Sequence, residues 1–214
     1  MVLKLESVSY SYSTKSRAVI KNMNYEFNEG KVYAVMGKSG AGKTTLLSLL
    51  SSLAKPTNGK IIYKDIDISQ IDQYKYRSEY IGVIFQSFNL LPNLTAIENV
   101  MLSMDISNKK IDDKQTQALN LLKSVGLDQD TAKRRILKLS GGEQQRVAIA
   151  RTLAYNPSVI LADEPTGNLD GETEDSILNI FENLAHKENK CVIIVTHSKE
   201  VGQRADEIYA LQKS

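Results

Sequence analysis

Hydrophobic and polar residues alternate along the first part of the chain, a pattern typical of strands with one exposed face. Leu3 and Leu5 alternate with the charged Lys4 and Glu6, and the same alternation connects Met23, Tyr25 and Phe27. We therefore expect the chain to begin with β structure that extends to about residue 36.

Later in the chain, short continuous apolar runs alternate with segments of helical pattern. Such runs are typical of strands buried on both faces, and their alternation with helices predicts a parallel sheet with helices on each side. The expected strands are residues 32–36, 59–63, 81–85, 159–162, 191–195 and 207–211, with helices over residues 44–53 and 172–187 and a polar connection over residues 65–71.

The texture changes between residues 87 and 155, where apolar residues recur at helical spacing. Ala118, Leu122 and Val125 mark one helix face. The spacing also predicts a helix over residues 131–137 and a long helix that starts at Ser140. We interpret this region as a helical subdomain inserted into an α/β core, which divides the chain into residues 1–86, 87–155 and 156–214.

One glycine-rich stretch lies between the buried strand 32–36 and a helix, and it fits the pattern G-x-x-x-x-G-K-[ST]. Its glycines let closely spaced backbone N–H groups approach phosphate oxygens. The Lys43 ammonium then suits the β- and γ-phosphates, and the Thr44 hydroxyl suits Mg²⁺. A glycine-rich turn is the alternative, but the flanking strand and helix favour a nucleotide site. The stretch consists of Gly37, Lys38, Ser39, Gly40, Ala41, Gly42, Lys43, Thr44 and Thr45.

Candidate catalytic and metal-binding residues stand at the carboxyl ends of the buried strands, where parallel sheets bind their ligands. Asp163 is positioned for Mg²⁺, and Glu164 for orienting or deprotonating a water. Gln86 is able to ligate Mg²⁺ or hold a water through its amide oxygen, and His197 to donate to a γ-phosphate oxygen. Taken alone, Gln86 also fits a solvated loop residue and His197 a structural histidine.

A second anion-binding arrangement is predicted at Ser140, Gly141 and Gly142, where a hydroxyl and free N–H groups begin a helix. Ser140 and Glu143 also have the spacing of a capping box, and the two interpretations are compatible. One nucleotide has one set of phosphates. Two chains arranged head to tail would let the Ser140 site of one close on the γ-phosphate held by the other.

Together these motifs resemble the ATP-binding subunit of an ABC transporter, in order and in spacing, over nearly the whole chain. Within that family, residues 85–91 and 98–100 are similar to the group that serves lipoprotein release, macrolide export, haem export and resistance to antimicrobial peptides. The stretches that carry the resemblance are the loop at Gly37, LSGGEQQR at 139–146, LADEPTGNLD at 161–170 and VTH at 195–197.

The resemblance implies an ABC-type ATPase fold, with a P-loop core whose sheet is mixed but largely parallel, an antiparallel β subdomain and an inserted helical subdomain. It implies ATP and Mg²⁺ as cofactors. Tyr12 matches the aromatic that stacks on adenine, with Tyr10 as the alternative. His197 matches the switch histidine, Glu164 the general base, and Asp170 the loop that crosses the dimer interface.

The resemblance also implies a subunit that forms a homodimer on ATP and drives a separate membrane permease from the cytoplasmic face of the membrane. Gln86 matches the glutamine that contacts this permease. Residues 86–91 carry Phe88, Leu90 and Leu91, more apolar surface than a solvated loop needs. We expect part of this surface to receive a short permease helix; the alternative is that these side chains pack inside the helical subdomain.

Composition agrees with a globular protein of one large domain: the 214 residues are 42% hydrophobic and 24% charged. The net charge of +2 gives no sign of nucleic-acid binding. No apolar run approaches the about 18 residues that span a bilayer. The single cysteine, Cys191, allows no internal disulfide, which favours a reducing, cytoplasmic setting.

Three other functions fit parts of the sequence. A small-molecule kinase shares the phosphate loop but needs an acceptor site and an Arg-rich lid, where this chain has LSGGE. ATPases of the same family in DNA repair carry a long coiled coil before that motif, and those of translation usually carry two such domains. An ATPase that transmits force to an extracellular partner without transport remains open.

Overall fold

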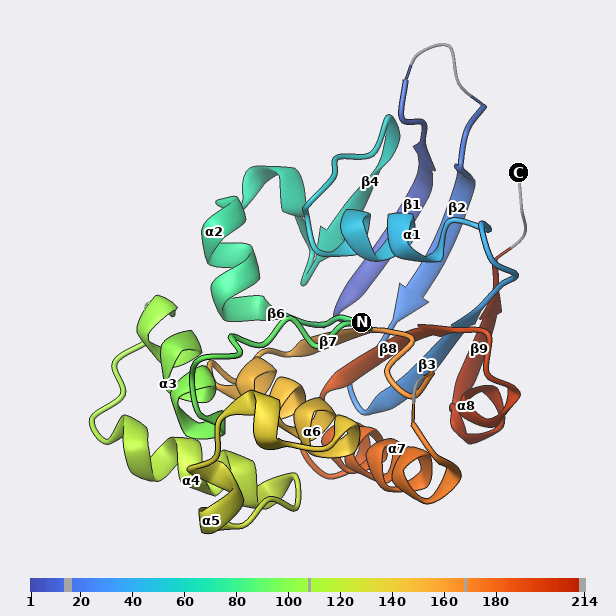
Figure 1. Ribbon diagram of the computed structural model, residues 1–214. Coiled ribbons are helices and arrows are strands. Elements are labelled where there is room, and N and C mark those ends of the chain that lie inside the picture. Colours follow the sequence, from blue (N-terminus) through green and yellow to red (C-terminus); the bar gives the residue numbers. More distant parts are fainter. Residues whose placement is uncertain (14–16, 108, 168, 212–214) are drawn as a thin grey trace.

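The computed structural model describes residues 1–13, 17–107, 109–167 and 169–211. Two sheets lie one above the other, and helices fill the space between them and cover the outer face of the lower one (Figure 1). The strands are β1 (Leu3–Tyr10), β2 (Ile20–Phe27), β3 (Lys31–Met36), β4 (Asn58–Tyr63), β5 (Ile66–Asp67), β6 (Ile81–Ile84), β7 (Val159–Asp163), β8 (Cys191–Thr196) and β9 (Glu207–Ala210).

The upper sheet has the order β2-β1-β4-β5 and is antiparallel throughout. Its register pairs Leu3 with Phe27 and Leu5 with Tyr25, as the alternation of apolar residues requires for one buried face. The buried side chains of this sheet join a core cluster with α1 (Lys43–Leu50), which lies between the two sheets.

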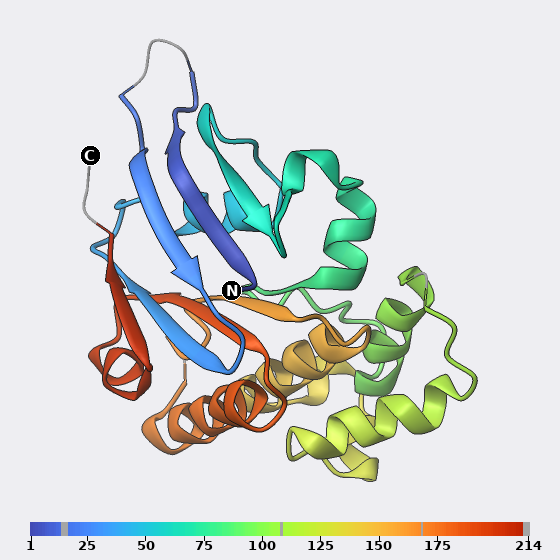
Figure 2. The ribbon, with the colours of Figure 1, turned by 180° about the vertical axis from the view of Figure 1, so that it is seen from behind.

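The lower sheet has the order β6-β7-β8-β3-β9 and is parallel throughout. Every residue of β8 is buried, which agrees with its continuous apolar sequence. Figure 2 shows α6 (Gly141–Leu153) and α7 (Gly171–His186) under this sheet, on the side away from α1. Because helices cover both faces of this sheet, its strands β7 and β8 are apolar along their length, and polar residues stand at their carboxyl ends.

The segments between β5 and β6, and between β6 and β7, are helical. The first contains a 3₁₀ turn (Ile68–Gln70), the short α2 (Gln73–Lys75) and a π-helical turn (Tyr76–Tyr80). The second contains α3 (Ala96–Ile106), α4 (Lys114–Ser124), α5 (Gln129–Ala132), a 3₁₀ turn (Ile136–Lys138) and α6; a last helix, α8 (Lys199–Arg204), precedes β9.

The prediction of one helix over residues 131–137 is wrong. α5 ends at Ala132, and the chain is extended at Arg135, where it forms a β-bridge with Thr95. The Ala96 N–H donates to the carbonyl of Arg134, and the Ile136 N–H donates to that of Leu94. These long-range bonds replace the local helical ones. The polar connection over residues 65–71 likewise contains β5 and a 3₁₀ turn.

The predicted fold class is confirmed: a largely parallel α/β core, an antiparallel sheet and a helical insertion between β6 and β7. The division at residues 86 and 155 falls just after β6 and just before β7. Those boundaries stay our interpretation.

Candidate nucleotide site

A cavity of about 450 Å³ opens at the carboxyl ends of β3, β6 and β7. Its walls come from the loop before α1, the first turn of that helix, the two acidic residues at the end of β7, and the segment after β1. The lining residues are Tyr12, Val19, Ser39, Gly40, Gly42, Lys43, Thr44, Thr45, Gln86, Asp163 and Glu164.

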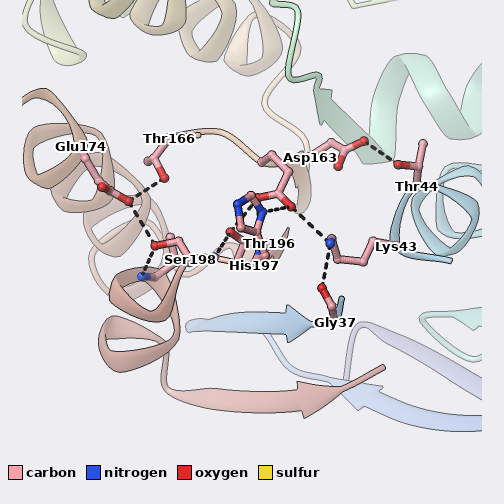
Figure 3. Close-up of polar contacts among 11 residues, drawn as sticks. Gly37, Lys43, Thr44, Asp163, Thr166, Glu174, Thr196, His197 and Ser198 are labelled. Carbon is pink, nitrogen blue, oxygen red and sulfur yellow. Dashed lines mark hydrogen bonds and ion pairs between the residues drawn. The ribbon is translucent and has the colours of Figure 1, made fainter. Parts of the chain in front are cut away.

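The loop between β3 and α1 turns through left-handed conformations at Gly40 (φ 75°) and Gly42 (φ 97°), which glycine adopts without a steric penalty. Space is a second reason for glycine: a Cβ on Gly37 would lie 2.8 Å from the Leu211 carbonyl oxygen. Lys43 folds back over the loop and donates to the Gly37 carbonyl at 2.8 Å (Figure 3). The ammonium is thereby held at the cavity wall.

Glu164 stands directly after β7 with φ 44°, an uncommon conformation for a residue other than glycine and one that often marks functional sites. Its Oε1 lies 3.3 Å from Lys43 Nζ and 2.7 Å from His197 Nδ1. The Thr196 hydroxyl donates to Oε2 at 2.9 Å. Burial raises the pKa of the Glu164 carboxyl, but the bonds from His197 and Thr196 outweigh it, and the net pKa lies below the ordinary value. The carboxylate is therefore ionised at neutral pH.

Oxygen donors gather at one end of the cavity. The Thr44 hydroxyl donates to Asp163 Oδ2 at 3.2 Å, as Figure 3 shows, and the exposed Gln86 lines the same wall. Burial raises the pKa of the Asp163 carboxyl, and the bond from Thr44 partly offsets this. A hydroxyl, a carboxylate and an amide oxygen make a donor set that suits a hard divalent cation such as Mg²⁺.

Tyr12 and Tyr10 are the two candidates for stacking on the adenine ring. Tyr12 lines the cavity, whereas Tyr10 packs against the core between the sheets. The Tyr12 side chain is 70% exposed, and its hydroxyl lies 2.8 Å from Thr45 Oγ1. The rings of Tyr10 and Tyr12 meet edge to face at 5.2 Å. The Tyr12 ring is thus held by its hydroxyl and by Tyr10 while it stays exposed, so it offers a flat surface to a nucleobase.

The remaining predicted site residues lie apart from this cavity. Ser140 begins α6 as its N-cap, and the capping box with Glu143 is present in both directions. Gly141 and Gly142 follow, and a Cβ on Gly142 would lie 2.5 Å from Thr173 of α7. Asp170 caps α7 by accepting from the Thr173 N–H. Asn168, within the motif at 161–170, lies outside the described residues.

The apolar residues after Gln86 divide between the two expected environments. Leu90 packs against the core of the helical region, and Phe88 is partly buried. Leu91 stays exposed. Two of these side chains are thus partly buried and one is exposed, and docking of a permease helix near residues 86–91 stays a prediction.

Two residues at this site carry no signal that sequence reasoning used. Thr196 is the last residue of β8, is 1% exposed, and bonds both Glu164 and the Ser198 N–H. Glu174 accepts from the Thr166 hydroxyl at 2.8 Å and from Ser198 at 3.4 Å, which ties α7 to the segment after β7. A polar residue that ends a fully apolar strand is the one hint that would have found Thr196.

Within the described ranges, no helix combines the length and the apolar character that crossing a bilayer demands.

Comparison with known proteins gives a consistent result. A family model described as ABC transporter matches residues 20–167. The uncharacterized ABC transporter ATP-binding protein YclH of Bacillus subtilis is 42% identical over 205 residues, which cover 96% of this chain and 91% of that protein. The lipoprotein-releasing system ATP-binding protein LolD of Rickettsia felis is 41% identical, with coverage of 99% and 95%.

A solved structure extends the match to three dimensions. The ATP-binding cassette MJ0796, a protein of Methanocaldococcus jannaschii, was solved as a dimer in a post-hydrolysis state bound to ADP and Pi. It superposes with a TM-score of 0.89 at 38% identity and covers 98% of this chain and 94% of that chain. Taken with the site, these matches show that the chain belongs to the ABC transporter family, as an ATP-binding subunit that hydrolyses ATP.

Proposed function

We propose that ATP binds with its phosphates on the loop before α1 and its adenine against Tyr12. The N-terminus of α1 and the loop supply backbone N–H groups, and Lys43 supplies a cation. Thr44, Asp163 and Gln86 would hold Mg²⁺, together with phosphate oxygens and water. When bound, the metal ion neutralises charge on the phosphates.

We assign the role of general base to Glu164, and one observation carries this assignment. Its carboxylate is kept ionised by His197 and Thr196 and stands 3.3 Å from Lys43, the residue that faces the phosphates. A carboxylate in that position is able to accept the proton of a water that attacks the γ-phosphate. Lys43 stabilises the charge that develops, and His197 orients Glu164 and the γ-phosphate.

The active state is a head-to-tail homodimer that forms with ATP. The cavity of a chain is not lined by its own Ser140, Gly141 and Gly142. The N-terminus of α6, where these residues lie, nevertheless offers an oxygen and N–H groups to an anion. This supports contact with the nucleotide of a second chain. The dimeric arrangement of MJ0796 supports the same arrangement for this chain. Asp170 then lies in the segment between the two sites.

A permease is the partner that ATP hydrolysis drives, and the chain meets it at the cytoplasmic face of the membrane. A groove of about 280 Å³ supports this docking; its walls come from the α2 region, from α3 and from Tyr155. Tyr74 (80% exposed) and Ile106 (67% exposed) form its apolar rim. Part of its wall is the last turn of α3, the helix that also bonds Leu91 of the loop after Gln86 through Asn99.

The cargo class we favour is an amphipathic compound, such as a lipoprotein, a peptide or a macrolide. LolD of Rickettsia felis, at 41% identity, belongs to a lipoprotein-releasing system by its name, which supports this choice. The same ATPase would also serve a complex that transmits force to an extracellular partner without transport.

Complementation between two inactive variants tests the function and the dimer together. We expect Lys43→Ala and Ser140→Ala each to lose ATPase activity, one at the phosphate loop and one at the start of α6. A mixed head-to-tail dimer of the two contains one site with both residues intact. A mixed dimer should therefore have up to about half of the parent activity, and an equal mixture, in which about half of the dimers are mixed, up to about a quarter. Continued inactivity of the mixture, with both variants folded, would contradict the shared site.

A further inference from the structure

The loop after Gln86 contains two consecutive residues in a conformation that side chains avoid. Phe88 has φ 59° and Asn89 has φ 50°, and neither is glycine. Left-handed residues of this kind cost about 1–3 kcal/mol each, less for asparagine, and they persist only where the surroundings hold them. Two local bonds form at this turn: the Phe88 N–H donates to the Phe85 carbonyl at 3.0 Å, and the Asn89 N–H donates to the Ser87 carbonyl at 2.6 Å. The carbonyls of Phe88 and Asn89 accept hydrogen bonds from outside the loop.

Arg151, near the end of α6, supplies that restraint. One nitrogen of its guanidinium donates to the Phe88 carbonyl at 2.8 Å, and another donates to the Asn89 carbonyl. Within the described part of the chain, no carboxylate lies within salt-bridge distance of Arg151. Burial lowers the pKa of this guanidinium, so removing it from water is unfavourable. Its two acceptors are the carbonyls of the strained loop.

The end of α6 and the residues just after it also contact the strand that leads to this loop. The Thr152 hydroxyl lies 3.3 Å from the Val83 carbonyl, and the Tyr155 hydroxyl donates to the Ile81 carbonyl at 3.0 Å. The far end of the loop is held by α3, because Asn99 bonds both the N–H and the carbonyl of Leu91. The loop thus joins β6 to two helices of the inserted region.

One helix therefore connects two parts of the nucleotide chemistry. α6 begins at Ser140, which we assign to the nucleotide of the second chain, and reaches Arg151 eleven residues later, about 16 Å along its axis. Arg151 holds the loop two residues after Gln86, which lines the cavity of its own chain. These two bonds connect α6 to the segment that follows Gln86.

We propose that Arg151 is a positioning residue for ATP hydrolysis: its guanidinium fixes the strained turn at Phe88 and Asn89 and thereby places Gln86 against the nucleotide. The proposal rests on the role given to Gln86 in the proposed function. It also makes the position of Gln86 depend on the helix that begins at Ser140, so the two ends of α6 respond together.

A double-mutant cycle tests the proposal with the full-length chain. Arg151→Gln should lower kcat by about tenfold or more, because a group displaced by about 1 Å loses up to about a hundredfold. The KM for ATP should stay within about threefold of the parent, since Tyr12 and the phosphate loop are untouched. The discriminating measurement is the pair with Gln86→Ala. If Arg151 acts through Gln86, the double variant should be no slower than the slower single variant.

Arg146 is the matched control. It lies on the same helix and donates to the Val125 carbonyl and to Ser176, far from the loop after β6. Any loss in Arg146→Gln should multiply with that of Gln86→Ala. Arg151→Lys keeps the charge and one donor, so its kcat should lie between those of the parent and Arg151→Gln. If circular dichroism shows that Arg151→Gln does not fold, Arg151→Lys replaces it in the double-mutant cycle with Gln86→Ala.

Three results would overturn the proposal. One is a parental kcat in Arg151→Gln, and another is a loss that multiplies fully with that of Gln86→Ala. The third is a slow Arg151→Gln beside an unaffected Gln86→Ala, since Arg151 would then act by another route. A parent chain without ATPase activity would contradict the proposed function instead, so the two failures are distinguishable.

Discussion

Lys43 Nζ lies 3.3 Å from Glu164 Oε1, and both side chains are only 10% exposed. The pair joins the phosphate loop to the end of β7, and the ammonium has one further acceptor, the Gly37 carbonyl. An entering γ-phosphate competes with Glu164 for the same ammonium. The carboxylate we assign as the base thus also opposes nucleotide binding through this ion pair.

Replacement of Glu164 separates its two effects. Glu164→Gln should lower kcat by at least about a hundredfold, because the amide is unable to accept the proton of the attacking water. ATP affinity should be equal to or higher than that of the parent, since Lys43 loses its charged competitor. Steady-state ATPase and nucleotide-binding assays measure the two quantities. Glu172→Gln, at an exposed position at the start of α7, is the control and should behave as the parent. Turnover of Glu164→Gln within a few-fold of the parent would refute the base assignment.

The tyrosine that faces the nucleobase is identified by a pair of variants. Tyr12→Ala should weaken ATP binding by about 1–3 kcal/mol, the size of base–aromatic stacking elsewhere. Tyr12→Phe should keep most of the affinity, because the ring remains and only the bond to Thr45 is lost. Tyr10→Ala should mainly lower the melting temperature, because this ring packs against the core. Equilibrium ATP binding and thermal unfolding of the three variants measure these effects. If Tyr10→Ala weakens ATP binding and Tyr12→Ala does not, Tyr10 is the residue that faces the nucleobase.

A charged residue placed in the groove beside α3 tests whether this groove binds the permease. Ile106→Glu should reduce the share of the chain that sediments with the membranes of its host, because a carboxylate in an apolar contact is costly to desolvate. The isolated variant should keep its ATP affinity, since α3 does not line the nucleotide cavity. Ile66→Glu makes the same change at a half-exposed position on β5, outside the groove. Equal membrane binding by both variants and the parent would exclude this surface.

A carboxylate far from the nucleotide sets a pH dependence of stability. Asp206 Oδ2 accepts from the Val32 N–H at 2.7 Å and lies 2.9 Å from His186 Nε2. Burial raises the pKa of Asp206, but these two bonds outweigh it and hold the pKa below its ordinary value of 3.8. A lowered folded-state pKa contributes stability above the unfolded-state pKa, and this contribution is lost as pH falls through the folded-state value.

Asp206→Asn should therefore lower the free energy of unfolding at pH 7 by about 1 kcal/mol, a value that allows for solvent screening at this partly exposed site. The difference from the parent should shrink as pH falls below about 4. Denaturant titrations at several pH values measure it, with the exposed Asp112→Asn as the control. A difference that stays constant down to pH 3 would mean that the ionisation of Asp206 is not its cause.

The parts of the site that the sequence predicts are those whose residues are close together in the chain. The phosphate loop, Asp163 and Glu164 are recognisable because neighbouring residues supply their function, and the apolar strands place them at one edge of a sheet. Long-range contacts explain what it missed. Helical spacing over residues 131–137 is overridden by the bridge between Thr95 and Arg135, a contact between distant parts of the chain.

The loop after Gln86 shows the same limit. Its apolar residues indicated a buried or docking surface, but nothing in its own sequence indicates left-handed turns at Phe88 and Asn89. The carbonyls of both residues accept from Arg151, more than sixty residues away in the chain. A partner of that kind is visible only in the folded structure, because its spacing obeys no local period.

The order of strands in the parallel sheet has a consequence for synthesis of the protein. β3, which leads into the phosphate loop, is paired with β8 and β9, and both lie far after it in the sequence. A ribosome-bound chain that has released only the residues through β7 holds β3 without either of its neighbours. Contacts between such distant segments form slowly. The phosphate loop therefore matures only after β8 and β9 have emerged, and until then an apolar interior strand of the sheet is open to association with chaperones or with other nascent chains.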